Sequence, residues 1–465
     1  MTVSRPTIDP RLEAVVKAYD VRGRSPEQLD PTLTRALGEA FALETGVDSA
    51  TVEGGGTVVI GHDMRDTSPD LVAAFSDGVR ARGGNVIGIG LASTDLLYFA
   101  SGDLDLPGAM ITASHNPAAY NGIKLCRAGA RPIGYDSGLS TIAETATSIL
   151  TDSDVQAAPL AGTYRELDAL SRYAAYLHEI VPVPPARRLR VVADAGNGMA
   201  GHTVPSVFAT LNVDLTPMYF ELDGTFPNHD ANPLDHSTLV DLQTKVREVG
   251  ADIGLAFDGD ADRCFVVDER GDVVSPSAIT ALIAARALVT TPGATILHNV
   301  ITSRAVPEII AENGGIAVRT PVGHSLIKAE MARTGAVFGG EHSGHFYFKD
   351  FFLADSGMIA ALHVMAALAE TDGTVSGLMA EYERYVSSGE INSTVDDAPA
   401  VLAELARVYT DLPQDTLDGL TVTSDSWWFN VRASNTEPLL RLNVEGDDDA
   451  TMARVRDEVL AIIRA

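Results

Sequence analysis

Three widely spaced segments of this sequence repeat one local plan, and this repetition constrains the fold more than any other feature. Each has a short apolar run, a polar or glycine-containing turn, and then a helix-like stretch. The segments are GTVVIGHDMR (56–65), LRVVADAGNGMAG (189–201) and ATILHNVITSRAVPEII (294–310), and helices are predicted over 68–82 and 203–211. Buried strands followed by helices indicate α/β units. Because more than a hundred residues separate successive segments, each is expected to open its own α/β domain.

The C-terminal part follows a different plan. SWWFNVR (426–432) and LLRLNVE (439–445) are predicted strands, and ATMARVRDEVLAIIR (450–464) has helical periodicity. This pattern predicts a smaller α+β domain. The polar stretch 386–399 is interpreted as a hinge or linker before it, and the polar stretch 144–162 as the first domain boundary.

Charge and cysteine content restrict the partners and the compartment. The 465 residues carry a formal net charge of −29, so the surface should repel nucleic acid and anionic membranes. Cys126 and Cys264 lie outside any CxxC pattern, which argues against a disulfide framework and indicates a cytoplasmic protein. We expect no secretory leader and no membrane span; the apolar stretch 358–369 is a predicted buried helix.

The segment GAMITASHNPAAYNGIKL (108–125) places Ser114 in a polar turn after an apolar run. A serine in such a loop can act as a nucleophile or carry a phosphoryl group. His115 and Lys124 would balance the charge of a phosphate there. An ordinary polar loop is the alternative, and the segment lacks the G-x-S-x-G pattern of a hydrolase elbow.

The segment ADIGLAFDGDADRCFVVDE (251–269) alternates Asp258, Asp260 and Asp262 with small residues. Clustered carboxylates need a cation between them, and oxygen ligands suit a hard ion such as Mg²⁺. The aspartates also match the first ligands of an EF-hand. That interpretation fails because Arg263 stands where the calcium loop needs glycine, and because the flanks are strand-like.

Two further segments offer polar groups for a ligand. VFGGEHSGHFYF (337–348) carries Glu341, Ser343 and His345, which can hydrogen-bond vicinal sugar hydroxyls; a Gly-rich turn between strands is the alternative. NVRASNTEPLLRL (430–442) combines a guanidinium, hydroxyls and turn N–H groups, as phosphate sites do. A simple hairpin turn is the alternative there.

Taken together and in this order, the four segments resemble the α-D-phosphohexomutase family, in particular its bacterial phosphomannomutase and bispecific phosphomannomutase/phosphoglucomutase members. The resemblance runs from AYDVRG (18–23) to RASNTEP (432–438) and includes FELDGTFPNHDANP (220–233) and PVGHSLIK (321–328). It implies an α/β fold of four domains around a central cleft, three of related topology with mixed sheets and a smaller C-terminal α+β domain. The implied domains are 1–160 with the phosphoserine loop, 161–262 with the metal loop, 263–384 with the sugar loop and 385–465 with the phosphate loop.

The resemblance also implies a role for each matching residue. Ser114 matches the phosphoserine, and Ser114, Asp258, Asp260 and Asp262 match the Mg²⁺ ligands. The residues that match the reacting centre are Arg22, His115, Lys124, Arg263 and His345. Those that match substrate-binding positions are Tyr19, His324, Glu341, Ser343, Arg432, Ser434, Asn435 and Thr436.

Two positions depart from the family pattern. Ile301 stands where bispecific members carry a lysine, which removes one substrate contact. His342 replaces the methionine usual in bispecific members and the glutamine usual in phosphoglucosamine mutases. His342 therefore argues against a glucosamine substrate.

The expected function is that of a phosphomannomutase, which interconverts mannose 6-phosphate and mannose 1-phosphate and supports GDP-mannose synthesis. The reaction would use a phosphoserine enzyme, Mg²⁺ and a hexose 1,6-bisphosphate as intermediate and activator. Small hexose phosphates would be its partners, and the enzyme a monomer or homodimer. A phosphoglucomutase or a bispecific mutase is the nearest alternative. A Mg²⁺-dependent phosphatase leaves Ser114 and the Arg432 loop unexplained, and a non-catalytic binding protein would not need the complete set of groups.

Overall fold

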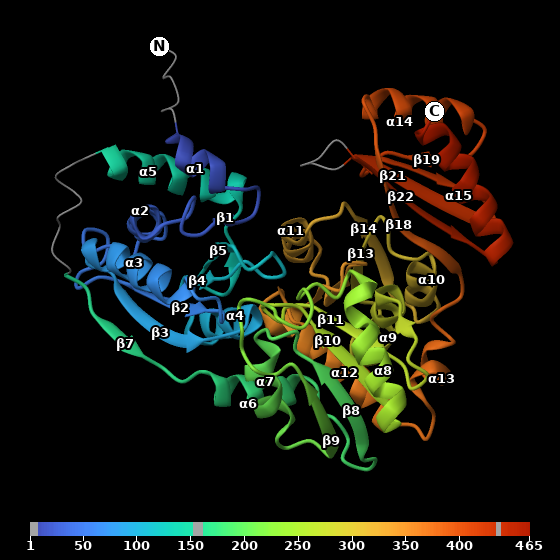
Figure 1. The fold of residues 1–465 in the computed structure, drawn as a ribbon, viewed down its shortest axis with the longest axis horizontal. Helices are drawn as coiled ribbons and strands as arrows, with labels where there is room; N and C mark the ends of the chain where they lie inside the picture. The colour runs from blue at the N-terminus through green and yellow to red at the C-terminus, as the bar shows by residue number, and fades with distance from the viewer. Residues whose placement is uncertain (1–7, 152–160, 434–438) are drawn as a thin grey trace. The chain divides into compact units, whose positions relative to one another are not determined.

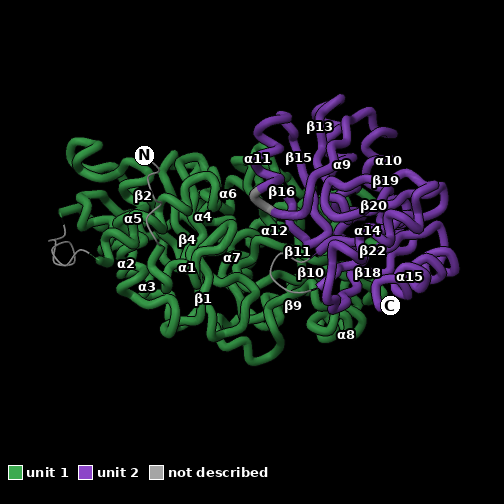
Figure 2. Tube along the Cα trace, turned by 90° about the horizontal axis from the view of Figure 1, so that it is seen from above, with its two compact units in different colours: residues 1–273, 347–375 green, residues 274–346, 376–465 purple. Residues whose placement is uncertain are grey.

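The computed structural model describes residues 8–151, 161–433 and 439–465, apart from the side chains of 324 and 325. The chain forms two compact units (Figure 2). Unit 1 contains Met1–Val273 and Tyr347–Val375, and unit 2 contains Val274–Phe346 and Ser376–Ala465. Among the described helices, none combines the length and apolar character that crossing a bilayer requires.

The first sheet of unit 1 has seven strands in the order β1-β5-β4-β2-β3-β7, with β6 paired to β5 (Figure 1). Strands β3, β2 and β4 are parallel, whereas β5 is antiparallel to β4 and β1. The strands are β1 (Val21–Arg24), β2 (Thr57–His62), β3 (Asn85–Leu91), β4 (Gly108–Ile111), β5 (Tyr120–Arg127), β6 (Arg131–Pro132) and β7 (Tyr164–Glu166). The helices of this part are α1 (Pro10–Val15), α2 (Pro31–Glu44), α3 (Ser68–Ala81), α4 (Thr94–Leu104) and α5 (Leu139–Thr151).

The second sheet has the order β12-β11-β10-β8-β9, in which β9, β8 and β10 are parallel and β11 is antiparallel to β10. Strand β10 is the run IGLAF, and all five of its residues are buried. A strand that is apolar on both faces must lie inside a sheet that is covered on both sides. The elements are β8 (Leu189–Asp194), β9 (Val213–Met218), β10 (Ile253–Phe257), β11 (Cys264–Val267), β12 (Val273–Val274), α6 (Leu170–Ile180), α7 (Ala200–Phe208) and α8 (Val240–Val249).

A later segment of the chain returns to unit 1. It holds the hairpin of β16 (Phe346–Phe348) with β17 (Ala354–Asp355), followed by helix α12 (Gly357–Ala369). Twelve of its thirteen residues are buried, as a helix that is apolar all round requires. A Cβ at Gly357 would lie 2.5 Å from the carbonyl carbon of Arg263, so only glycine lets α12 approach β11 this closely.

A buried carboxylate joins three parts of unit 1. Asp95, at the start of α4, accepts hydrogen bonds through Oδ2 from Tyr173 of α6 and from Ser356 before α12, both at 2.6 Å. Ser93 donates to its Oδ1. The three donors satisfy a carboxylate that is only 1% exposed.

Unit 2 contains a parallel arrangement in the order β14-β13-β15 and a second, antiparallel sheet in the order β18-β22-β21-β20-β19. Leu442, Phe429 and Val455 lie in the buried core between the antiparallel sheet and its helices. The first part is built from β13 (Thr295–Asn299), β14 (Ile316–Thr320), β15 (Phe338–Gly340), α9 (Pro276–Thr290), α10 (Ala305–Glu312) and α11 (His324–Thr334). The second contains β18 (Val386–Thr394), β19 (Gln414–Asp415), β20 (Leu420–Thr423), β21 (Trp427–Ala433), β22 (Leu439–Gly446), α14 (Ala398–Val408) and α15 (Asp449–Ile463), and α13 (Val375–Met379) precedes it.

The α/β class, the mixed sheets and the C-terminal α+β domain are confirmed. The strand and helix predictions for the C-terminal part agree with β21, β22 and α15, and α12 is the predicted buried helix. Within the polar stretch 386–399, which was interpreted as a hinge or linker, residues 386–394 form strand β18 and helix α14 begins at Ala398. The hinge itself stays a prediction. Val386 and Ile391 pack against the core, Ser393 is buried, and the other polar residues of the strand are exposed or half-buried. Residues 144–151 of the predicted boundary belong to α5, and 152–160 lie outside the described residues. The domain boundaries remain predictions.

Candidate active site

Ser114 lies just after β4, at the carboxyl end of the parallel strands, and has a positive φ of 49°. This left-handed conformation costs a serine about 1–2 kcal/mol, so its surroundings must hold it. The Ser114 N–H donates to Thr112 Oγ1 at 2.8 Å, and the Ser114 hydroxyl donates to Asp258 Oδ2 at 2.9 Å. The residue is 6% exposed, so the hydroxyl has a defined orientation toward the aspartate.

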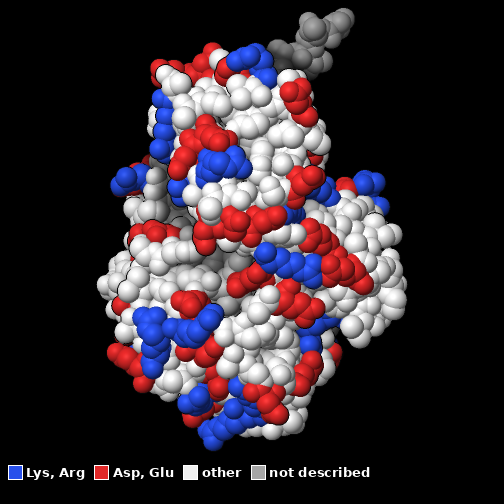
Figure 3. Space-filling view, turned by 90° about the vertical axis from the view of Figure 1, so that its right-hand side faces the viewer, with Lys and Arg blue, Asp and Glu red and all other residues white. Residues whose placement is uncertain are grey.

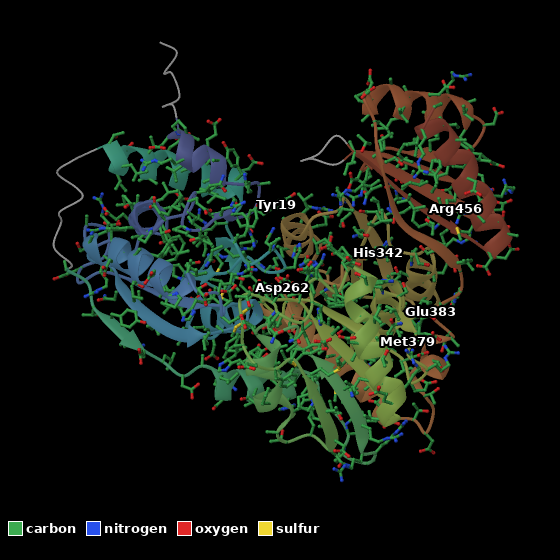
Figure 4. The ribbon with its side chains drawn as sticks, in the orientation of Figure 1. Tyr19, Asp262, His342, Met379, Glu383 and Arg456 are labelled. Carbon is green, nitrogen blue, oxygen red and sulfur yellow. The ribbon has the colours of Figure 1, made fainter. Side chains whose placement is uncertain are left out.

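The three aspartates lie in the short loop between β10 and β11; Figure 4 labels Asp262. Asp258, Asp260 and Asp262 are buried, with at most 1% exposure. Each offers one carboxylate oxygen, and these oxygens lie within 4.8 Å of one another. Ala261 has a φ of 58°, which produces the tight turn that brings the carboxylates together.

Two cationic side chains pair with this cluster and offset part of its negative charge. Lys124 of β5 donates to Asp260 Oδ2 at 2.9 Å and to Asp262 Oδ2 at 2.6 Å. Arg263 donates through Nε to Asp258 Oδ2 at 2.9 Å. Burial alone would lower the pKa of Lys124, but Asp260 and Asp262 raise it well above its usual value. Lys124 is therefore an ammonium group in this arrangement.

The pKa values of Asp258 and Asp260 shift in opposite directions. Burial raises the pKa of Asp258 to about 7, although Arg263 opposes this effect. Burial and Asp262 also act to raise the pKa of Asp260, but Lys124 and a hydrogen bond from Thr94 outweigh them, and the pKa falls below its usual value. A divalent cation bound between these crowded carboxylates would favour the ionised form of each one.

The donor set fits a hard divalent cation. All three groups are carboxylates, which Mg²⁺ prefers over softer ligands. Asp260 Oδ1 is buried and accepts no hydrogen bond from any residue that the structure describes. Such an acceptor is costly to leave unsatisfied, and a metal ion would satisfy it. Asp258, Asp260 and Asp262 are therefore suited to hold the ion.

Two more predicted residues lie beside Ser114. His115 Nδ1 is 3.2 Å from Ser114 Oγ and 2.5 Å from Arg263 Nη2. Burial, together with Arg263 and Arg22, lowers the pKa of His115 well below its usual value. The ring is therefore neutral, and its Nδ1 accepts from Arg263. Arg22 of β1 donates to Asn116 Oδ1 at 3.2 Å.

Tyr19 lies in the bend before β1 and is half-buried (Figure 4). The structure thus brings Ser114, His115, Lys124, Arg22, Arg263 and the three aspartates together within unit 1, and their roles stay predictions. The groups there can bind a cation and an anion at one place.

Two residues of this site have no signal in the sequence. Thr94, the first residue of α4, donates its N–H to the Asp260 carbonyl at 2.9 Å and its hydroxyl to Asp260 Oδ2 at 2.6 Å. Arg65 donates to the carbonyl oxygen of Ser114 at 2.8 Å. Neither spacing nor residue type distinguishes them, because both act on residues far away in the chain.

The predicted sugar loop lies in unit 2, after β15; Figure 4 labels His342. Ser343 Oγ is 2.9 Å from His345 Nδ1, and the Glu341 N–H donates to the His345 carbonyl at 3.0 Å. Glu341 is 2% exposed, and its Oε1 accepts from the Gly323 N–H at 3.2 Å. Ile301 is 7% exposed and offers no polar side-chain group. The loop therefore presents Ser343 and His345, with Glu341 behind them.

The predicted phosphate loop is described in part. Arg432, near the end of β21, donates through Nη2 to Glu390 Oε2 at 2.9 Å. Arg441 is its cross-strand neighbour on β22 and donates to Glu390 Oε1 at 3.3 Å. Two guanidinium groups that lie side by side suit a phosphate. Ser434, Asn435 and Thr436 lie outside the described residues, as does the side chain of His324.

The surface in Figure 3 mixes acidic and basic side chains, and the basic ones there form only small groups among the described residues. A continuous basic surface, which nucleic-acid binding generally needs, is not what this face presents.

Family models match four parts of the chain in succession. They are described as phosphoglucomutase/phosphomannomutase alpha/beta/alpha domain I at residues 13–152, domain II at 171–271, domain III at 275–385, and C-terminal domain at 390–462.

Full-length relatives agree with the family models. A "Phosphohexose mutases" protein of Xanthomonas campestris pv. campestris is 39% identical over 96% of this chain and 98% of its own length. A phosphomannomutase of Escherichia coli is 36% identical over 96% and 98%. A crystal structure of a phosphoglucomutase/phosphomannomutase family protein from Burkholderia thailandensis superimposes with a TM-score of 0.85 at 31% identity and covers 98% of both chains.

Proposed function

We propose that this chain, which belongs to the phosphoglucomutase/phosphomannomutase family and is therefore a phosphohexomutase, interconverts mannose 6-phosphate and mannose 1-phosphate with Ser114 as the phosphoryl carrier. The choice of mannose is supported by a relative that is itself named a phosphomannomutase. Glucose phosphates are the alternative substrates, since the family name includes both activities.

One observation carries the mechanism: the Ser114 hydroxyl donates to Asp258 Oδ2, a member of the carboxylate cluster, at 2.9 Å. A phosphoryl group on Ser114 would therefore lie against Asp258, Asp260 and Asp262, the residues suited to hold Mg²⁺. When bound there, Mg²⁺ would neutralise charge on the transferring phosphoryl group.

The chain's own residues perform the remaining tasks. The bond between phosphorus and Ser114 Oγ breaks as a bond forms to the free hydroxyl of a hexose monophosphate. The hydroxyl proton passes to a general base, and a hexose 1,6-bisphosphate results. Return of its other phosphoryl group to Ser114 completes the isomerisation. Lys124 or His345 would serve as general base and acid.

Arg263 and Lys124 contribute positive charge at the reacting group, and His115 and Arg22 position the serine loop. Arg432 would hold the phosphate that does not react, together with Ser434, Asn435 and Thr436. Glu341 and Ser343 would bind the sugar hydroxyls, and Tyr19 and His324 would complete the binding site. We also propose that the enzyme is cytoplasmic and that it is a monomer or homodimer. Light scattering would test the oligomeric state.

The decisive experiment treats the purified enzyme with Mg²⁺ and glucose 1,6-bisphosphate and follows its intact mass. The wild type should gain one phosphoryl group, and Ser114→Ala should gain none and lose mutase activity by several orders of magnitude. Ser148→Ala, an exposed serine on α5, is the matched control and should behave as wild type.

Product analysis then distinguishes the alternatives. Turnover of mannose 1-phosphate should exceed that of glucose 1-phosphate when the bisphosphate is present. Equal rates would replace the mannose assignment with a bispecific one. Release of inorganic phosphate without isomerisation would identify a phosphatase, and near-normal turnover by Ser114→Ala would disprove the carrier mechanism.

A further inference from the structure

Arg65 is a buried arginine whose two terminal guanidinium nitrogens both donate to the backbone of the serine loop. It follows β2, and its side chain is 1% exposed. Its Nε donates to Asp63 Oδ2 at 3.2 Å, and its two terminal nitrogens donate to four backbone carbonyl groups. These carbonyl groups belong to Ser114, Asn116, Pro117 and Tyr120, at 2.8, 2.6, 3.0 and 2.9 Å respectively.

This contact set matches the hydrogen-bonding capacity of the side chain. An arginine has five N–H donors in a planar fork. Arg65 makes one bond through Nε and two through each terminal nitrogen, so every donor has an acceptor. Three of the four carbonyl groups come from the turn between β4 and β5, and the fourth belongs to Tyr120, the first residue of β5. Arg65 thus supplies the bonds that a helix or sheet would otherwise provide.

A second stretch of the chain closes this contact from the other side. The Arg65 guanidinium lies over the ring of Phe226, 5.1 Å from its centroid. A Cβ at Gly224 would be 2.8 Å from Arg65 Cα, so only glycine allows this approach. Phe226 belongs to the conspicuous segment 220–233, for which the proposed chemistry has no role. The Phe226 ring covers one face of the Arg65 guanidinium and so helps to shield it from water.

We propose that Arg65 is a positioning residue for phosphoryl transfer, which fixes the serine loop so that Ser114 keeps its left-handed backbone and its hydroxyl faces Asp258. The inference rests on the proposed role of Ser114. Arg65 acts from behind the loop, on the carbonyl group of Ser114, while the hydroxyl points to the carboxylates. It therefore controls orientation and does not touch the reacting group.

The geometry explains why lysine cannot replace it. An ammonium group has three donors around one atom and cannot reach four carbonyl groups spread along the loop. Lysine would still keep the positive charge next to Asp63. Arg65→Lys therefore separates the positioning function from the charge. A displacement of the Ser114 hydroxyl by about 1 Å would lower the rate by about 100-fold.

The test compares Arg65→Lys with Arg127→Lys. Arg127 of β5 also donates to backbone carbonyl groups and to a carboxylate, Glu44, but it does so away from Ser114. For each protein, the rate of Ser114 phosphorylation by glucose 1,6-bisphosphate is measured by intact mass and divided by the folded fraction. Arg65→Lys should be slower by about 10- to 100-fold, with KM for the hexose monophosphate changed less than threefold, and Arg127→Lys should match wild type.

The outcomes separate the two proposals. If the wild type takes up no phosphoryl group, the function of Ser114 is wrong. If the wild type reacts and Arg65→Lys reacts equally fast per folded molecule, the positioning role is wrong, because a purely structural residue would lower only the folded fraction. Should Arg65→Lys not fold, Asp63→Asn removes the charge that orients the Arg65 fork and keeps the side-chain volume. A slower phosphorylation per folded molecule is expected there too, and an unchanged rate would refute the inference.

Discussion

The backbone of Gly259 lies directly against the carbonyl group of Ser114: a Cβ at residue 259 would be 2.5 Å from the Ser114 oxygen. The metal loop and the serine loop therefore meet through a position that tolerates no side chain. This contact sets the distance between the serine hydroxyl and the carboxylates.

Gly259→Ala should push the two loops apart. Because the opposing atom is a backbone oxygen, the loop itself must move, and phosphoryl transfer should slow by about 100-fold. Steady-state kinetics on protein with an unchanged circular dichroism spectrum would measure the effect. Gly373→Ala is the control, since that exposed glycine has only Thr371 side-chain atoms nearby. If Gly259→Ala and Gly373→Ala transfer the phosphoryl group at similar rates, the contact between Gly259 and Ser114 does not control the reaction.

Thr94→Val should weaken Mg²⁺ binding without removing a ligand. The Thr94 hydroxyl orients Asp260, and partners of this kind typically contribute about 10- to 100-fold in metal affinity. Magnesium titrations of activity and of the thermal unfolding midpoint should both shift to higher concentration. Thr290→Val, an exposed threonine on α9, should leave both titrations unchanged. Identical titrations for Thr94→Val and wild type would exclude this role.

Arg432→Ala should raise KM for the hexose monophosphate by about 100-fold and change kcat much less, because a charge-assisted contact to a non-reacting phosphate is lost. The Arg432 side chain is 13% exposed and already oriented by Glu390. Arg407→Ala, whose side chain is 72% exposed, serves as the control. A loss confined to kcat would contradict the assignment.

Asp95 should make unit 1 less stable as the pH rises from about 4 to 6. Burial raises the pKa of Asp95 to about 6, although hydrogen bonds from Ser356, Ser93 and Tyr173 lower it. The unfolded value is about 3.9, so in this window the folded protein binds a proton that the unfolded chain does not. Stability therefore falls with rising pH, and the deficit, about 3 kcal/mol, is complete above the folded pKa.

Asp95→Asn should remove this dependence, because its side chain is neutral at every pH. The urea midpoint of the variant, relative to that of the wild type, should increase as the pH rises from 4 to 7. Asp103→Asn, on the exposed side of the same helix, should follow the wild type throughout. Parallel curves for Asp95→Asn and wild type would show that the carboxyl group does not titrate in this range.

The sequence predicted those parts of the fold and site that depend on local pattern. The apolar runs on either side of Asp258 and Arg263 became β10 and β11, so the loop between them could be placed at a sheet end. The order of the family motifs then linked Ser114 to the aspartates, the first of which lies 144 residues further along the chain. Their contact is a property of tertiary structure that no local spacing encodes.

The remainder could not be predicted because it depends on contacts between distant segments. Arg65 and Thr94 resemble any arginine or threonine until the backbone groups that they bind are known. Strand β18 has no clear strand pattern in the sequence because most of its residues are polar, as suits a strand at the edge of its sheet. Val386 and Ile391 are the hydrophobic residues of this strand that pack against the core.

The return of Tyr347–Val375 to unit 1 has a consequence for biosynthesis. While the ribosome makes the chain, the first 273 residues emerge with strand β11 still lacking α12. Ser356, which binds Asp95, is also still missing. Residues 274–346 must then emerge before the missing helix becomes available. The nascent protein therefore carries an open apolar surface through that interval, and this is the stage at which a chaperone that shields such surfaces would act on it.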